Sequence, residues 1–183
     1  MKEQSNASDS LLYPFLFVAI LWLVKIVEVY FHLYFGGYGI IPRTAVGLVG
    51  IVTGPLIHIN FVHLFSNSLP LLILGILVFN FYRKIAFEIF IWIYLLSGLC
   101  VWIIGKPGSH IGASGLVYGF ASFIFFSGFF RRNFKALLLS LLIVIVYGSI
   151  VSGLLPSAGR VSWQTHLYGA MVGAMCAFFY RNE

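Results

Sequence analysis

The residues best suited to chemistry in this sequence are a serine and a histidine that each lie where a polar loop meets an apolar segment. Ser114 follows Ala113 and precedes Gly115 at the start of one apolar segment, and His166 stands near the start of a later one. An imidazole that hydrogen-bonds a serine hydroxyl can take its proton and turn it into a nucleophile. The two residues therefore predict serine-based acyl transfer, provided that the fold brings them together.

The spacing of the glycines indicates that the helices of Ser114 and His166 pack closely together. Gly115 and Gly119 form one pair separated by four residues, and Gly169 and Gly173 form another. Such pairs lie on one helix face and let two membrane helices approach closely. The serine adjoins the first pair and the histidine precedes the second by three residues, so we expect hydroxyl and imidazole to come within hydrogen-bond reach. A serine among small residues is also typical of close helix packing without any chemistry.

His63 and Asn67 are candidate donors for the oxyanion of that reaction. They are four residues apart in a third apolar segment and so share one helical face. The backbone N–H of Ser114, near a helix N-terminus, can add a third donor. Asn67 is equally typical of a hydrogen bond between helices. His58, at the edge of this segment, either lines the entry of water or is an interfacial histidine with its hydrogen bonds satisfied.

An acidic third member of a catalytic triad is not evident. The chain has five carboxylate residues, and Glu28 alone lies toward the same side of the membrane as the serine. Lys25, three residues earlier, is its natural partner in a structural ion pair. We therefore expect a Ser-His dyad. Tyr118, one turn after the serine, either packs against the imidazole in place of an orienting acid or is an ordinary packing residue.

The composition indicates an integral membrane protein. Of 183 residues, 61% are hydrophobic and only 9% charged, which is far from the balance of a soluble domain. The net charge is +6, and the basic residues occur singly or in groups of two or three between apolar runs. This pattern excludes nucleic acid as a partner. Cys100 and Cys176 lie in apolar segments without a CxxC pair or a histidine cluster, so neither a disulfide framework nor a metal site is indicated.

Six apolar stretches have about the 20 residues that a membrane-spanning helix needs. They predict an all-α, polytopic helical bundle, with residues 1–10 as a short polar tail and 11–183 as a single six-helix domain. The linker at 33–57 carries six glycines and two prolines, and we expect it to lie in or against the membrane interface. The predicted spans are 11–32, 58–80, 86–104, 112–130, 136–154 and 163–180.

The basic residues orient the bundle. If the N-terminus is cytoplasmic, seven of them fall on the inner side and three on the outer side, which favours cytoplasmic termini and a bacterial inner membrane. The spans that carry Asn67, Ser114 and His166 then all begin at the outer face. The inner residues are Lys2, Arg83, Lys84, Arg131, Arg132, Lys135 and Arg181, and the outer ones are Arg43, Lys106 and Arg160.

At these residues the sequence resembles the rhomboid family of intramembrane serine proteases. Any one motif is weak, but three motifs in this order across six spans are specific. The matching elements are His58, His63 and Asn67 in the second span, Gly112, Ala113, Ser114, Gly115 and Tyr118 in the fourth, and His166, Gly169 and Gly173 in the sixth.

The resemblance implies Ser114 as nucleophile and His166 as base, with His63 and Asn67 in the oxyanion region and Tyr118 packed beside the base. It also implies cleavage of transmembrane protein substrates near their outer ends, among membrane lipids, with neither cofactor nor metal. The fifth span becomes a candidate lateral gate, and residues 154–162 a candidate cap over the site.

One departure from the family concerns the first loop. Rhomboids often carry a Trp-Arg pair shortly before the second span, whereas residues 47–54 here read GLVGIVTG. Arg43 is the residue that could take over part of that structural work. Two other classes remain: an inactive rhomboid-like protein that binds membrane proteins, which would be expected to lack the serine or the histidine, and a small transporter, which would place its polar groups near the bilayer midplane.

Overall fold

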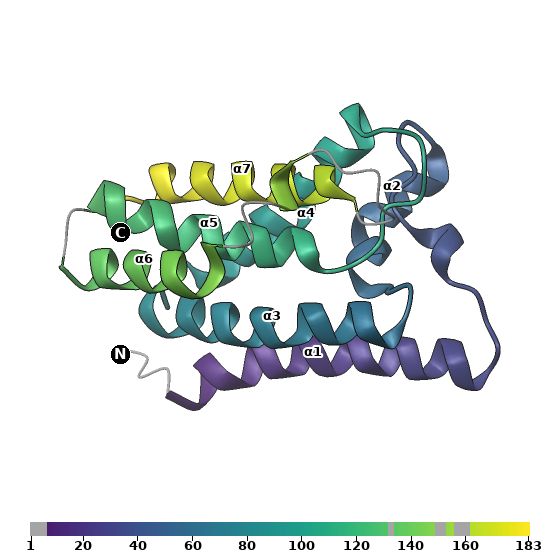
Figure 1. The fold of residues 1–183 in the computed structure, drawn as a ribbon, viewed down its shortest axis with the longest axis horizontal. Coiled ribbons are helices and arrows are strands. Elements are labelled where there is room, and N and C mark those ends of the chain that lie inside the picture. Colours follow the sequence, from purple (N-terminus) through teal and green to yellow (C-terminus); the bar gives the residue numbers. More distant parts are fainter. Residues whose placement is uncertain (1–6, 132–133, 149–152, 156–161) are drawn as a thin grey trace.

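The computed structural model describes residues 7–131, 134–148, 153–155 and 162–183, and all regular elements within them are helices (Figure 1). Several predictions fall outside these residues: the first part of the polar tail, Lys2, Arg132, Arg160 and positions 156–161 of the candidate cap. In chain order the helices are α1 (Ala7–Tyr30), η1 (Gly36–Tyr38), α2 (Ala45–Thr53), η2 (Gly54–Leu56), α3 (Phe61–Phe81), α4 (Ala86–Ile104), α5 (Ser114–Arg131), α6 (Phe134–Tyr147) and α7 (Trp163–Phe179).

The prediction of an all-α helical bundle is confirmed, and each predicted span corresponds to one helix, in order α1, α3, α4, α5, α6 and α7. The boundaries differ where a local interaction sets them. α3 begins three residues later than predicted because the Asn60 side chain accepts a hydrogen bond from the His63 backbone N–H at 2.8 Å and caps the helix there. α6 ends at Tyr147, and positions 149–152 of the predicted span 136–154 lie outside the described residues.

Four of these helices, α1, α3, α4 and α5, are long and apolar enough to cross a membrane. Helices α6 and α7 have 14 and 17 residues, fewer than the about 20 that a span of roughly 30 Å takes. Apolar side chains cover the exterior, including Phe15, Leu23 and Ile145, each more than half exposed. The chain is an integral, multi-pass membrane protein.

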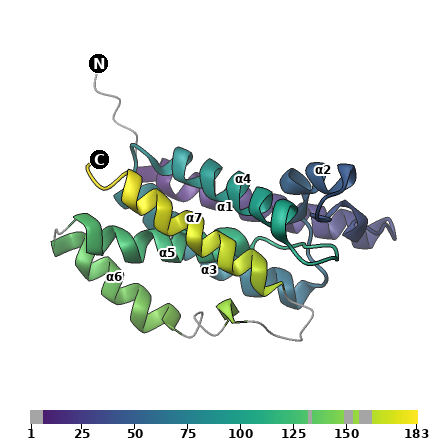
Figure 2. The ribbon, with the colours of Figure 1, turned by 90° about the horizontal axis from the view of Figure 1, so that it is seen from above.

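Helix α5 forms the centre of the bundle. It contacts α3, α4, α6 and α7, and Figures 1 and 2 show α7 running along it while α6 splays to one side. In its apolar stretch 67% of the residues are buried, against at most 39% in the other three long helices. The first residue of α5 therefore starts from a position enclosed by protein rather than lipid.

The contact between α5 and α7 depends on glycine. A Cβ added at Gly169 would overlap the carbonyl oxygen of Gly115, and one added at Gly173 would overlap that of Gly119. The two backbones thus touch along both glycine pairs, as close-packed membrane helices do. This contact fixes the register of α7 against α5, and with it the level of His166 relative to Ser114.

The first loop is more ordered than its glycine content suggests. It contains η1, α2 and η2, and α2 packs against α4. Thr44 caps α2 by accepting a hydrogen bond from the Gly47 N–H at 3.0 Å. Arg43 donates to the carbonyl oxygens of Ile103 and Gly105, both at 3.1 Å, and so satisfies the C-terminal end of α4. The loop is thereby fastened to the bundle without a Trp-Arg pair.

Candidate active site

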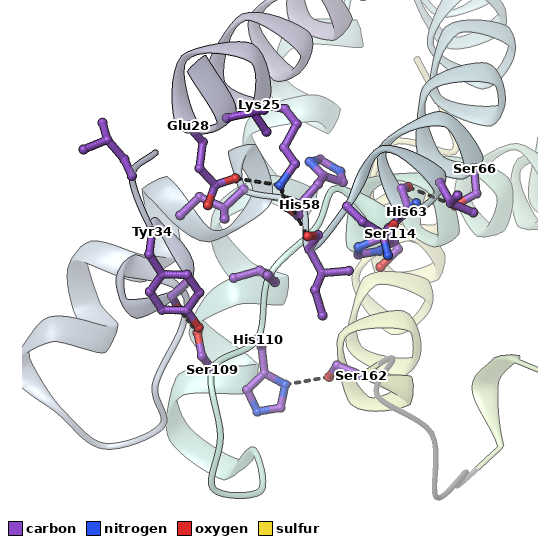
Figure 3. A pocket seen from close by; sticks show the side chains of 18 of the residues that line it. Lys25, Glu28, Tyr34, His58, His63, Ser66, Ser109, His110, Ser114 and Ser162 are labelled. Carbon is purple, nitrogen blue, oxygen red and sulfur yellow. Dashed lines mark hydrogen bonds and ion pairs between the residues drawn. The ribbon is translucent and has the colours of Figure 1, made fainter. Parts of the chain in front are cut away.

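A cavity of about 900 Å³ opens at the end of the bundle where α1 ends and where α5 and α7 begin (Figure 3). Its wall is formed by the C-terminal end of α1, the first loop, the start of α3 and the loop before α5. Ser114, His58 and His63 all line it. Such a hollow allows water and an extended peptide to reach the serine.

The segment before Ser114 is held by four hydrogen bonds to other parts of the chain. The Gly112 N–H donates to the Gly54 carbonyl at 3.0 Å, and the Ala113 N–H donates to His58 Nε2 at 3.3 Å. Two residues earlier, His110 and Ile40 exchange backbone hydrogen bonds. Ser114 is then the first residue of α5 and is 8% exposed, with its N–H among the free donors at a helix N-terminus.

Gly112 brings His63 to this turn. Its φ of +111° favours glycine, and a Cβ there would lie 2.6 Å from His63 Cε1 and 3.0 Å from Nε2. The imidazole therefore packs directly on the glycine two residues before Ser114. This contact places a side-chain donor from α3 beside the serine on α5.

Asn67 lies one turn deeper on α3. It is 5% exposed, and its Nδ2 donates to the carbonyl oxygen of His63 at 3.0 Å. An amide has two N–H donors, so this bond leaves one of them. Unlike His63, Asn67 does not line the large cavity in the described part of the chain.

His166 is oriented by the main chain. Its Nδ1 lies 3.0 Å from the Gly153 carbonyl oxygen, which can only accept, so the proton sits on Nδ1 and the lone pair on Nε2. Nε2 is buried without a hydrogen-bond partner among the described residues. The structure thus holds Ser114 and His166 at the same end of two touching helices, and the hydrogen bond between them is not formed in this state.

Tyr118 lies flat against the His166 ring. The two ring centroids are 4.1 Å apart and the planes differ by 7°. A Cβ at Gly153 would overlap the Tyr118 hydroxyl and lie 3.3 Å from His166 Nδ1, so the same glycine touches both rings. The imidazole is therefore fixed by one stacking contact and one backbone acceptor.

His58 is buried in the neutral form. It is 1% exposed, and burial, together with the neighbouring His63 and Lys25, lowers its pKa from 6.5 to about 4. A neutral ring is what its contact with Ala113 needs, because Nε2 must carry a lone pair to accept that N–H. His58 lines the cavity and also supports the turn before Ser114.

The predicted ion pair of α1 belongs to the same wall. Lys25 Nζ lies 2.7 Å from Glu28 Oε2, and it also donates to the carbonyl oxygens of His58 at 3.1 Å and Ile59 at 3.3 Å. Glu28 accepts a further bond from the Phe35 N–H at 2.9 Å. The pair ties α1 to both the first loop and the segment that leads into α3 (Figure 3).

Sequence reasoning missed two contributors to the site. Gly153 acts through its carbonyl, which every residue has, so no residue type could reveal it. His110 lies in a polar loop, where a histidine gives no signal of a buried contact, yet it is 8% exposed and hydrogen-bonded at both ring nitrogens. The described residues hold no group of three or more histidine, cysteine or acidic side chains that could bind a metal ion.

Comparison with known proteins gives one family and several bacterial relatives. A family model described as the Rhomboid domain matches residues 45–183, which include α2 to α7. Uncharacterized proteins of Mycobacterium tuberculosis and Mycobacterium bovis are each 38% identical over 175 residues, covering 88% of this chain and 71% of the relative. An uncharacterized protein of Mycobacterium leprae is 34% identical over 176 residues, covering 88% of this chain and 68% of its own length.

Proposed function

This chain belongs to the rhomboid family, and from that premise we propose that it is an intramembrane serine endopeptidase that cleaves transmembrane proteins near the outer face of the membrane. The observation that carries the proposal is the state of His166. Its Nδ1 proton is held by a backbone carbonyl, and its Nε2 has no hydrogen-bond partner within the described part of the chain. The neighbouring helix α5 begins with a serine that lines the cavity.

Acylation begins at Ser114. His166 Nε2 takes the hydroxyl proton as the oxygen attacks the substrate carbonyl, and the imidazolium then gives that proton to the leaving amine. The hydrogen bond between Ser114 and His166 Nε2 would form when the substrate occupies the site, since catalytic hydrogen bonds often tighten only in the enzyme–substrate complex. The Gly153 carbonyl and the Tyr118 ring keep the imidazole in place through both transfers.

The tetrahedral intermediate needs donors for its oxyanion. His63, packed on Gly112, and the first N–H groups of α5 are the nearest candidates, and Asn67 has one free N–H to add. Water from the large cavity then hydrolyses the acyl-enzyme, with His166 as base. No step of this cycle calls for a cofactor or a metal ion.

The substrate enters as a helix and must be cut as an extended chain. A helical peptide hides its carbonyls in i to i−4 hydrogen bonds, so substrates with helix-breaking residues near the cut should react faster. We place the cut at the outer side because the cavity lies at the end of the bundle opposite the two ends that carry Arg83, Lys84 and Arg181. The protein then has both termini in the cytoplasm, in a bacterial inner membrane.

The nucleophile assignment is tested with purified protein and a model transmembrane substrate. Ser114→Ala and His166→Ala should each reduce cleavage by at least about a thousandfold, because the two groups act as one unit. A fluorophosphonate probe should label the wild type and leave Ser114→Ala unlabelled. Cleavage that persists in Ser114→Ala would reject this serine as the nucleophile.

A second candidate function is an inactive rhomboid-like binder of membrane proteins. The absent hydrogen bond at His166 Nε2 favours it, whereas the oriented ring and the preserved serine favour the protease. Wild-type protein that captures transmembrane segments but neither cleaves them nor reacts with the probe would establish the binder. A transporter is disfavoured because the polar groups gather at one end of the bundle instead of its middle.

A further inference from the structure

A hydrogen bond joins the loop before the nucleophile to the helix that carries the base. His110 Nδ1 lies 2.6 Å from Ser162 Oγ (Figure 3). The other ring nitrogen, Nε2, lies 2.9 Å from the Lys106 carbonyl oxygen. His110 is 8% exposed. Neither the proposed reaction nor the motifs of the sequence give this residue a task.

The hydrogen bonds around His110 and Ser162 fix the direction of each donor. Because the Lys106 carbonyl can only accept, Nε2 carries the proton and Nδ1 accepts from the Ser162 hydroxyl. Ser162 Oγ in turn accepts from the Thr165 N–H at 3.3 Å and from the Thr165 hydroxyl at 3.0 Å. The serine thus donates once and accepts twice, which uses its full capacity, and it also caps the N-terminus of α7.

His110 and Ser162 have the same sequence separation from the two residues of the proposed dyad. His110 is four residues before Ser114, and Ser162 is four residues before His166. A second bond in the same place, from the Lys106 N–H to Gln164 Oε1 at 2.8 Å, strengthens the junction. Deeper in the bundle the two helices are joined by glycine contacts, so this junction closes the α5–α7 pair at its outer end.

We propose that His110 is a positioning residue that holds the start of α7 against the nucleophile loop and thereby sets the separation of Ser114 and His166. The proposal rests on the proposed serine protease function for its effect on reactivity. Its structural part, the tie between the loop and α7, stands independently of that function. A 1 Å misplacement of reacting groups costs on the order of a hundredfold in rate, so a loosened junction should be readily measurable.

The test compares probe labelling of Ser114 in His110→Ala, His110→Asn, Ser162→Ala and the double variant His110→Ala with Ser162→Ala. His110→Ala should lower the second-order rate constant about ten- to a hundredfold. His110→Asn, whose side-chain oxygen can accept from Ser162, should recover part of it, and the double variant should react no more slowly than Ser162→Ala. Labelling of His110→Ala at the wild-type rate, or fully additive losses in the double variant, would overturn the proposal.

A matched control is His32→Asn, which removes another imidazole from the same cavity at a position whose φ of +52° asparagine tolerates. It should label at the wild-type rate. Amide hydrogen exchange of residues 163–167, measured on the same proteins, should speed up in His110→Ala and stay unchanged in His32→Asn. If the wild type does not react with the probe, the proposed protease fails, and the exchange comparison alone still decides whether His110 holds α7.

Discussion

At the scale of single residues, the site depends on groups that accept or make room as much as on groups that react. His166 is oriented by a carbonyl, Ala113 is held by a neutral imidazole, and His63 reaches the turn only because Gly112 has no side chain. The serine and histidine of the proposed dyad stand out in the sequence because of their surroundings, and their roles stay predictions. The acceptors could not, because the position of a carbonyl or the tautomer of a ring depends on the folded chain.

Gly112→Ala should abolish probe labelling while leaving the protein in the membrane. The new Cβ would displace the His63 ring, and it would also strain a backbone with φ of +111° by about 1–2 kcal/mol. Gly108→Ala is the matched control, because its φ is +137° and nothing lies within 4 Å of its Cβ position. Equal loss of labelling in both variants would show that strain alone, rather than the His63 contact, is responsible.

His58 should make the folded protein sensitive to acid. Its pKa is about 4 in the folded state and near 6.5 when exposed, so the unfolded chain binds the extra proton first. Stability contributed by the neutral ring is therefore fully present above pH 6.5 and is lost as the pH falls toward 4, by about 3 kcal/mol in total. The melting temperature in detergent, followed from pH 7.5 to 4, measures this loss.

His58→Gln keeps a group that can accept from the Ala113 N–H but cannot bind a proton in this range. Its melting temperature should start lower than that of the wild type and fall less between pH 6.5 and 4. Parallel curves for the two proteins would mean that another group controls the acid response.

At the scale of helices, the sequence predicts most of the bundle because long apolar runs bounded by polar residues are a strong signal. It fails where the signal is local: Asn60 sets the start of α3, α6 ends at Tyr147 just before Gly148, and α2 lies in a loop rich in glycine. Glycine in α2 has a packing purpose, since a Cβ at Gly47 would overlap the Ile41 carbonyl. Such a contact depends on how the loop folds back on itself, which residue types alone do not show.

Gly169→Ala should push α7 away from α5 and lower both stability and reactivity. The added Cβ would overlap the Gly115 carbonyl oxygen, so the helices must separate, and overpacking of this kind typically costs 1–3 kcal/mol. We expect a lower melting temperature and at least tenfold slower probe labelling. Met171→Ala, on the lipid-facing side of the same helix at 59% exposure, should change neither by a comparable amount.

At the scale of the whole molecule, the polar groups that matter are gathered at one end and the basic ends of the helices at the other. The bundle can therefore expose its cavity to water while its sides, covered by apolar side chains, face lipid. The orientation of this axis in the membrane decides on which side the proposed cleavage takes place. The distribution of Lys and Arg predicts this orientation, which can be tested directly.

A membrane-impermeant thiol reagent applied to intact cells should label Gly37→Cys in the first loop and spare Asn182→Cys at the C-terminus. Position 37 is exposed, with nothing within 4 Å of its Cβ position, so a cysteine there is tolerated and reachable. Both variants are made with Cys100 and Cys176 replaced by alanine, so that the new thiol is the one detected. The reverse labelling pattern would place the cavity, and the proposed cleavage, on the cytoplasmic side.

The carbonyl that holds the His166 ring affects how well the site tolerates substitutions. In a triad with a carboxylate, one substitution removes the orienting group, whereas here that group is part of the peptide backbone and survives any change of side chain. The hydrogen bond is lost, however, if the backbone at position 153 is displaced. A shift of this backbone by a few ångströms would leave Ser114 and His166 chemically intact but would let the imidazole turn away.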